Sequence, residues 1–171
     1  MKRLTLVRHA KSSWAEISLP DHDRILAERG IRDAPRMGKR IHARKLRPSL
    51  IISSAAVRAM RTAVYLAEAL KYPKEFLQSE ERLYLASAQQ ILDIVCSQED
   101  NFSDLMVVGH NPGMTDLVNQ LLPGMKLPNL STCGVVAMDF DTDAWADLAS
   151  SKASLVFYDF PKNPELLLIE D

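Results

Sequence analysis

Cysteine is scarce in this 171-residue sequence, which contains only Cys96 and Cys133. Two cysteines cannot form the disulfide framework of a small secreted domain, and their spacing fits no zinc-binding pattern. Long apolar runs are also lacking, because no stretch approaches the about 18 residues that a membrane-spanning helix needs. The first residues, MKRLTLVRHAK, lack the apolar region of a signal peptide. We therefore expect a cytoplasmic protein with no membrane partner.

The rest of the composition is that of an ordinary folded domain. Hydrophobic residues make up 47% of the chain and charged residues 25%, which excludes collagen-like, low-complexity and disordered classes. A chain of this length has enough apolar surface for a substantial core. Because no internal repeat or long linker divides it, we predict that residues 1–171 form a single domain.

Charge is distributed unevenly, although the formal net charge is only −1. Residues 1–47 carry 13 lysines and arginines against 5 acids, whereas residues 139–171 carry 2 against 8. The basic stretch at 29–47 suggests nucleic-acid binding, but no RNA- or DNA-binding motif accompanies it. A solvated helix face explains the stretch more simply, so we expect no nucleic-acid partner. Docking of an acidic protein there stays open.

Short apolar runs alternate with stretches of helical periodicity, which predicts a layered α/β fold. Strands are expected at 2–7, 49–53, 75–78, 104–109, 134–140 and 155–160, the last two paired antiparallel. Helices are expected around 31–41 and at 57–70, 87–97 and 114–122. The predicted inward faces are Ile31, Ala34, Met37 and Ile41 in the first helix and Val57, Met60, Val64, Ala67 and Leu70 in the second.

Charged and imidazole side chains follow three of the predicted strands. The first strand runs into Arg8 and His9, and the fourth into His110. The second strand leads to a helix start that bears Arg58. Ligands of open α/β sheets bind outside the carboxyl ends of the strands, so these four groups are expected to converge. Guanidinium groups match phosphate oxygens, and a neutral imidazole is a nucleophile, so the pattern predicts a phosphate site with catalytic capacity.

Each of these residues alone has a more ordinary interpretation. A single histidine at a strand end is more often structural than catalytic, and a single arginine in a helix is more often solvated. The joint pattern of three strand ends outweighs those interpretations. His22 lies in a polar loop and is a weak candidate for the pocket rim, whereas His42 lies on the basic helix. No histidine spacing is typical of a metal site, so none is expected.

Four ordered motifs resemble those of the histidine phosphatase superfamily, and most closely the short phosphohistidine phosphatases of the SixA type. LVRHAK at 6–11 resembles the R-H-G/A motif, and DRILAERG at 23–30 resembles D-R-P-L-x-x-R-G, with Ile25 in place of the usual proline. SAAVRAMRT at 54–62 resembles S-x-x-x-R-A-x-x-T, and VGHNP at 108–112 resembles the segment of the second histidine. The resemblance implies a phosphoglycerate mutase-like α/β/α sandwich with three layers, a mostly parallel sheet and no large cap insertion.

The resemblance also implies roles for individual residues. His9 would be the nucleophile that is transiently phosphorylated, Arg8 and Arg58 would hold the phosphoryl oxygens, and His110 would be a further donor. Secondary substrate-binding candidates are Lys11, Ser12, Arg24 and Asn111. No metal and no other cofactor is implied, because the guanidinium groups supply positive charge.

Three functions are compatible with these residues. The first is hydrolysis of phosphohistidine on a partner protein, such as a histidine phosphotransfer domain, with inorganic phosphate held in the pocket. The second is hydrolysis of small phosphomonoesters, whose poorer leaving group needs a general acid, for which Glu81 is the candidate. The third is a phosphoprotein-binding module without catalysis, although binding alone needs no nucleophile. The first is our leading hypothesis.

Overall fold

A six-stranded sheet forms the centre of the protein in the computed structural model, which describes residues 1–164. Its strands are β1 (Lys2–Arg8), β2 (Leu50–Ser54), β3 (Gln78–Glu80), β4 (Asp104–Gly109), β5 (Val135–Phe140) and β6 (Ala153–Asp159), in the order β3-β2-β4-β1-β5-β6. The pairs β1–β4, β2–β4 and β2–β3 are parallel, and β5 is antiparallel to both β1 and β6. The sheet is therefore mostly parallel, as predicted.

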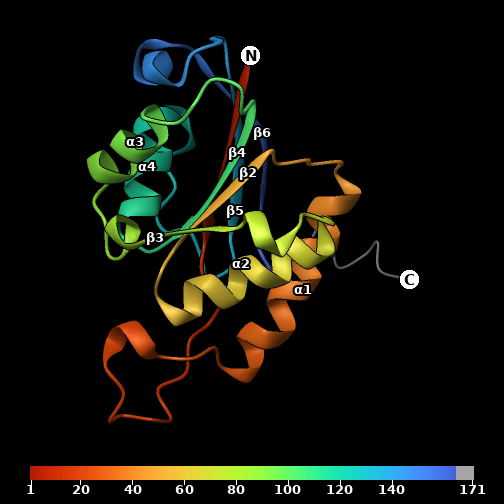
Figure 1. Ribbon diagram of the computed structural model, residues 1–171, viewed down its shortest axis with the longest axis vertical. Helices are drawn as coiled ribbons and strands as arrows, with labels where there is room; N and C mark the ends of the chain where they lie inside the picture. The colour runs from red at the N-terminus through yellow and green to blue at the C-terminus, as the bar shows by residue number, and fades with distance from the viewer. Residues whose placement is uncertain (165–171) are drawn as a thin grey trace.

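Helices cover both faces of this sheet, which completes the predicted three layers (Figure 1). Helices α1 (Glu28–Ala43) and α2 (Val57–Ala69) pack together on one face, and α3 (Ala88–Cys96) and α4 (Gly113–Leu121) on the other. Short 3-10 turns lie at η1 (Asp21–Asp23), η2 (Lys74–Phe76), η3 (Glu81–Leu83), η4 (Pro123–Met125) and η5 (Trp145–Ser150). No helix within residues 1–164 is long and apolar enough to cross a bilayer.

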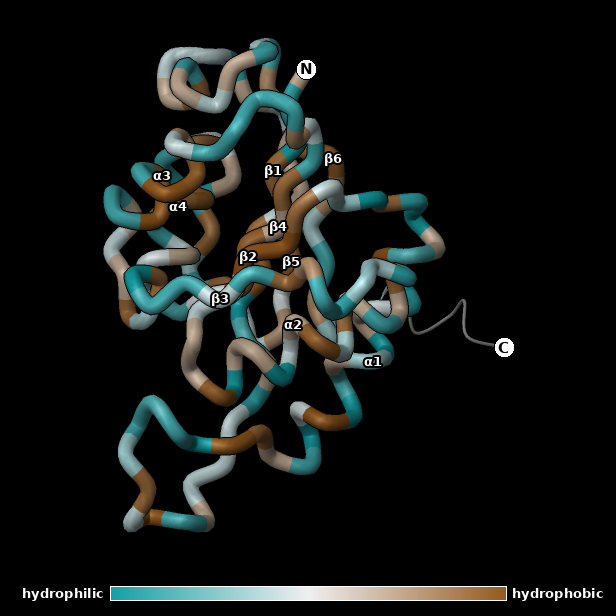
Figure 2. The backbone as a smooth tube through the Cα atoms, in the orientation of Figure 1, coloured by the Kyte–Doolittle hydropathy of each residue, from teal (hydrophilic) through white to brown (hydrophobic). Residues whose placement is uncertain are grey.

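The core consists of two hydrophobic clusters, one on each side of the sheet. Successive side chains of β4 alternate between them, with Leu105 and Val107 on the α3–α4 side and Met106 and Val108 on the α1–α2 side. Burial on both faces explains why the central strands have almost uninterrupted apolar sequences. In Figure 2 the strands at the centre of the molecule are coloured mainly as hydrophobic residues, in agreement with this burial.

Three local predictions need correction. The third strand is Gln78–Glu80, because residues 74–76 form a 3-10 turn in which the Phe76 N–H donates to the Pro73 carbonyl. Ile31 does not face the core and is 48% exposed. In α2 the predicted Ala67 and Leu70 are buried, whereas Val57, Met60 and Val64 are only partly buried. The rest of the buried face is Arg58, Ala59, Thr62, Ala63 and Leu66. Small side chains are needed there because α1 approaches closely, and a Cβ on Gly38 would lie 2.5 Å from the Ala69 Cβ.

Gly30 provides a test of how α1 supports the loop after β1. A Cβ at this position would lie 2.3 Å from the backbone oxygen of Lys11, which is two residues from His9. Gly30→Ala is therefore expected to lower the free energy of unfolding by about 1–3 kcal/mol, measured by urea denaturation. Gly124→Ala is the matched control, because a Cβ there meets nothing within 4 Å. Equal stability of the two variants would contradict the prediction.

Candidate active site

The carboxyl ends of β1 and β4 place two imidazoles side by side. These strands are parallel neighbours with Arg8 opposite Gly109, and the His9 N–H donates to the Gly109 carbonyl at 3.0 Å. The ring centroids of His9 and His110 lie 5.1 Å apart. Arg58 comes from the first turn of α2, which follows β2 on the other side of β4. The four predicted groups therefore gather at one edge of the sheet.

His9 has a free nucleophilic nitrogen. Its Nδ1 lies 2.8 Å from the Ala10 carbonyl oxygen, which can only accept, so Nδ1 carries the proton and Nε2 has the lone pair. Burial above all, together with His110, Arg58 and Arg8, lowers the pKa of His9 to about 3. The ring is therefore neutral at physiological pH, as attack on phosphorus requires.

His110 is held in the complementary tautomer by Ser54. The Ser54 Oγ accepts a hydrogen bond from the Ala56 N–H at 3.2 Å and lies 2.8 Å from His110 Nε2. Nε2 is the one acceptor that the described chain offers to the Ser54 hydroxyl proton, so we assign that proton to this bond and the ring proton to Nδ1. Burial lowers the pKa of His110 to about 4. This histidine is therefore a neutral hydrogen-bond donor.

Two buried donors of the site have no acceptor within the part of the chain that the structure describes. They are His110 Nδ1 and Arg8 Nε. The Arg8 side chain is positioned by a 3.0 Å hydrogen bond from Nη1 to the Leu130 carbonyl, and burial lowers its pKa. Unpaired buried donors cost free energy, and an oxyanion supplies the missing acceptors. The cluster therefore fits a phosphoryl group.

Thr62 connects the nucleophile segment to the helix of Arg58. Its Oγ1 accepts from the Ala10 N–H at 2.9 Å and donates to the Arg58 carbonyl at 2.7 Å. All these atoms are buried. The threonine of the S-x-x-x-R-A-x-x-T motif thus links β1 and α2, which fixes the relative positions of His9 and Arg58.

Asp21 lies where several cationic and hydroxyl donors meet. Arg58 donates from Nη1 to the Asp21 carbonyl at 2.6 Å and from Nη2 to Oδ2 at 3.0 Å. Arg24 donates to Oδ1 at 3.1 Å, and the Tyr84 hydroxyl donates to Oδ2. These donors, the Tyr84 hydroxyl above all, hold the pKa of Asp21 well below its ordinary value. Tyr84 also has an edge-on ring contact with His110, at 5.4 Å between centroids.

Sequence reasoning assigned no role to Asp21, Tyr84 or Ser54. Ser54 belongs to a quoted motif, and its position just before the Arg58 helix was the available signal. Asp21 and Tyr84 carried no such signal, because they are 63 residues apart and meet only through the folding of two loops.

The secondary candidates occupy different places. Arg24 is buried, donates to the Ser12 hydroxyl and stacks on the Trp14 ring with its guanidinium carbon 3.2 Å from the ring centroid. Ser12 is also buried, whereas Lys11 is exposed. Arg24 therefore connects the Ser12 hydroxyl to the Asp21 carboxylate.

The side chains of Asn111 and Glu81 contact residues other than His9. The amide of Asn111 donates to the Asn129 side chain and the Leu130 carbonyl and accepts twice from Thr115, so it orders its loop. Substrate binding by Asn111 stays a prediction. The Glu81 side chain is 76% exposed, with its Oε2 3.4 Å from Nε2 of His22. His22 has an edge-on ring contact with Tyr84, so it lies at the rim as suspected.

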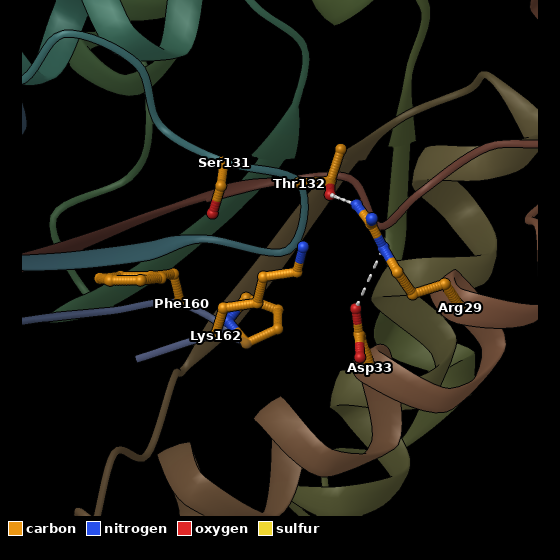
Figure 3. Close-up of a pocket in the computed structure, with 7 residues that line it drawn as sticks. Arg29, Asp33, Ser131, Thr132, Phe160 and Lys162 are labelled. Atoms are coloured by element: carbon orange, nitrogen blue, oxygen red, sulfur yellow. Dashed lines mark hydrogen bonds and ion pairs between the residues drawn. The ribbon is translucent and has the colours of Figure 1, made fainter. Parts of the chain in front are cut away.

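A cavity of about 240 Å³ lies beside the start of α1, lined by Arg29, Asp33, Ser131, Thr132, Phe160, Pro161 and Lys162. Figure 3 shows the Arg29 side chain between Thr132 and Asp33, with Lys162 across the opening. None of the four predicted catalytic side chains lines it. It is therefore distinct from the cluster around His9.

Comparison with known families agrees with this geometry. Residues 4–83 match the model of the histidine phosphatase superfamily (branch 1), a segment that includes Arg8, His9 and Arg58. A candidate phosphohistidine phosphatase, SixA, from Agrobacterium tumefaciens has 26% sequence identity and a TM-score of 0.80, covering 94% of this chain and 98% of that one. Over residues 4–83 the chain therefore matches the histidine phosphatase superfamily. Its predicted fold and family are thereby confirmed.

Two further proteins are similar to this chain over most of their length. A second SixA candidate, from Nakamurella multipartita, has 26% identity and a TM-score of 0.80, covering 95% of this chain and 97% of that one. An uncharacterized Mycobacterium tuberculosis protein is 29% identical over 165 residues, which is 91% of this chain and 100% of that protein. The match to the superfamily model and the two SixA neighbours support a phosphatase.

Ser54 provides a test of the tautomer assigned to His110. Ser54→Ala removes the donor to His110 Nε2, so the ring is free to place its proton on the wrong nitrogen. We expect kcat/KM to fall at least about tenfold, because a hydrogen bond to the developing charge is lost. Ser53→Ala is the matched control, since Ser53 is equally buried but bonds only to the Ser54 carbonyl. Equal losses in both variants would contradict a specific role for Ser54.

The two neutral imidazoles predict the pH dependence of stability. Their pKa values in the folded protein, about 3 for His9 and about 4 for His110, lie below the ordinary 6.5. Below pH 6.5 the unfolded chain binds more protons at these positions, so stability falls as pH falls, by up to about 1.4 kcal/mol per pH unit for each ring. Urea denaturation from pH 7.5 to 4.5 measures this slope. His110→Gln should reduce the slope, and an unchanged slope would contradict the assignment.

Proposed function

We propose that this histidine phosphatase hydrolyses phosphohistidine on a partner protein through a phosphorylated His9. The observation that carries the proposal is the free Nε2 lone pair of a neutral His9 beside two buried donors without acceptors. An exposed phosphohistidine would place its phosphoryl group against this nitrogen. The name of the Agrobacterium neighbour gives the same substrate class and supports the choice.

The reaction would proceed in two displacements on phosphorus. In the first, His9 Nε2 forms a bond to phosphorus, the phosphorus–nitrogen bond of the substrate breaks, and its electron pair leaves with the substrate imidazole, which takes up a proton. Arg8, Arg58 and His110 Nδ1–H would bind the phosphoryl oxygens throughout. In the second, water attacks the phosphorus of phosphorylated His9 and gives up a proton to solvent. The Nε2–phosphorus bond breaks and its electron pair returns to Nε2, which releases inorganic phosphate and neutral His9.

Electrostatics accounts for most of the proposed catalysis. Phosphoryl transfer needs mainly positioning and stabilisation of charge on the oxygens. Opposite unit charges at about 4 Å attract by about 4 kcal/mol at an effective dielectric constant near 20, so two guanidiniums offset much of the desolvation of a phosphoryl group. On this basis we propose that turnover requires no metal.

The exposed position of Glu81 favours phosphohistidine over a phosphate ester. An alkoxide is a poor leaving group and needs a general acid beside the scissile oxygen, whereas an imidazole leaves more readily. Glu81 contacts His22 at the rim, and Tyr84 lies between His22 and His110. Hydrolysis of small phosphate esters with Glu81 as the acid is therefore the second candidate function. Its support is the Glu81–His22 contact, which keeps Glu81 at the rim of the site.

His9→Ala and a chelator together test the mechanism. With a phosphohistidine peptide as substrate, we expect wild type to release phosphate equally well with and without EDTA. His9→Ala should lose at least about a thousandfold in kcat, because the nucleophile is absent. A brief reaction with labelled substrate, followed by alkaline quench, should trap label on wild type only. Normal turnover by His9→Ala would contradict the proposal, and stoichiometric binding without phosphate release would favour a binding module.

The same assay separates the two enzyme candidates through Glu81→Gln. The phosphohistidine proposal expects little change with the peptide. A large loss of activity on small phosphomonoesters, combined with better turnover of esters than of the peptide by wild type, would favour the second candidate.

A further inference from the structure

We propose that Asp21 is a positioning residue of the phosphoryl site, which holds Arg58 in register with His9 and leaves the oxyanion position open. The inference rests on the proposed function only in taking the cluster around His9 as the place where the phosphoryl group binds. It assigns a purpose to a carboxylate that the catalytic steps above do not use.

The Arg58 guanidinium donates two hydrogen bonds to Asp21. Nη1 donates to its carbonyl and Nη2 to its Oδ2, at 2.6 and 3.0 Å. Each terminal nitrogen carries two N–H groups, so one on each stays available for a phosphoryl oxygen. These two hydrogen bonds restrict the Arg58 guanidinium before any ligand binds. Less conformational entropy is then lost when the phosphoryl group binds to the remaining N–H groups.

Asp21 is itself held from two further directions. Arg24, whose other nitrogens bond to the Ser13 carbonyl and the Ser12 hydroxyl, donates to Oδ1. The Tyr84 hydroxyl donates to Oδ2. The carboxylate therefore joins the segment after β1, the start of α2 and the segment after β3. With its pKa well below the ordinary value, it stays ionised across the physiological range.

The Asp21 carboxylate does not occupy the position expected for the phosphoryl group. A carboxylate that occupied the phosphoryl position would accept from the inward donors of the site. Instead, Arg8 Nε and His110 Nδ1 have no hydrogen-bond partner in the described chain. The carboxylate lies on the outer side of Arg58, with its side chain 43% exposed.

The negative charge of Asp21 also brings the net charge of the site to the value that balances a phosphoryl group. Arg8, Arg24 and Arg58 contribute three positive charges, the two imidazoles are neutral, and Asp21 reduces the total to two. A phosphoryl group with two negative charges is then compensated without an excess that would retain inorganic phosphate. Loss of the carboxylate charge should therefore leave oxyanion binding intact while Arg58 loses its alignment for the chemical step.

Asp21→Asn in the full-length protein tests this separation of binding from chemistry. We expect kcat for the phosphohistidine peptide to fall at least about tenfold, because Arg58 is misaligned. The inhibition constant for inorganic phosphate should stay the same or decrease, and the melting temperature should match wild type. Asp23→Asn is the matched control, since Asp23 lies on the same 3-10 turn. Within residues 1–164 its carboxylate contacts only the His22 ring, at 3.5 Å. Its kcat should stay within about twofold of wild type.

A second variant guards against a general disturbance of the loop. Tyr84→Phe keeps the ring against His110 but removes one hydrogen bond to Asp21, so its kcat should fall by less, again without weaker phosphate inhibition. The proposal is overturned if both variants match Asp23→Asn, if kcat rises, or if kcat, phosphate affinity and melting temperature of Asp21→Asn fall together. Absence of turnover in wild type would instead contradict the proposed function.

Discussion

Two imidazoles buried beside arginines can remain in a protein only as neutral rings, and much of the site is arranged around that constraint. Desolvation and the neighbouring guanidiniums lower both pKa values, to about 3 for His9 and about 4 for His110. A neutral imidazole has one donor and one acceptor, so each ring needs a partner that selects the tautomer. The Ala10 carbonyl leaves His9 with a lone pair, and the Ser54 hydroxyl leaves His110 with a proton. The same cause thus produces a nucleophile and a donor.

The sheet supplies the geometry that this chemistry needs. Because β2, β4 and β1 are parallel neighbours, their carboxyl ends deliver Arg58, His110 and His9 to one edge without any long loop. The strands are buried on both faces, so the backbone at that edge is rigid where the reaction is sensitive to small displacements. The segment between β1 and α1 extends beyond this edge, and Asp21 on that segment then reaches back to Arg58 (Figure 1).

Sequence patterns predict the site residues that local structure positions, and they miss the residues that only contacts between distant segments position. Arg8, His9, Arg58 and His110 follow strands directly, so local patterns locate them, and the strand ends bring them together. The buried face of α2 was mispredicted because hydrophobicity alone favours Met60 and Val64, whereas close approach of α1 selects alanines. Asp21 and Tyr84 meet across 63 residues, and no periodicity encodes such a contact. Glu81 lies in the predicted segment, yet its side chain turns to His22 instead of His9.

The uneven charge of the chain has an internal explanation. The basic N-terminal third and the acidic C-terminal segment meet across the sheet, because β1 pairs with β5, and β5 with β6. Arg3 pairs with Asp139 at 2.7 Å, and Arg40 of the basic helix pairs with the fully buried Asp159 at 2.6 Å. A buried carboxylate needs such a partner, since an unpaired one is strongly destabilising. Part of the positive charge that suggested a polymeric anion is therefore held by the protein's own acids. Arg8 is part of the proposed phosphoryl site and Arg24 holds its Asp21, so on that proposal the anion bound there is a single phosphoryl group.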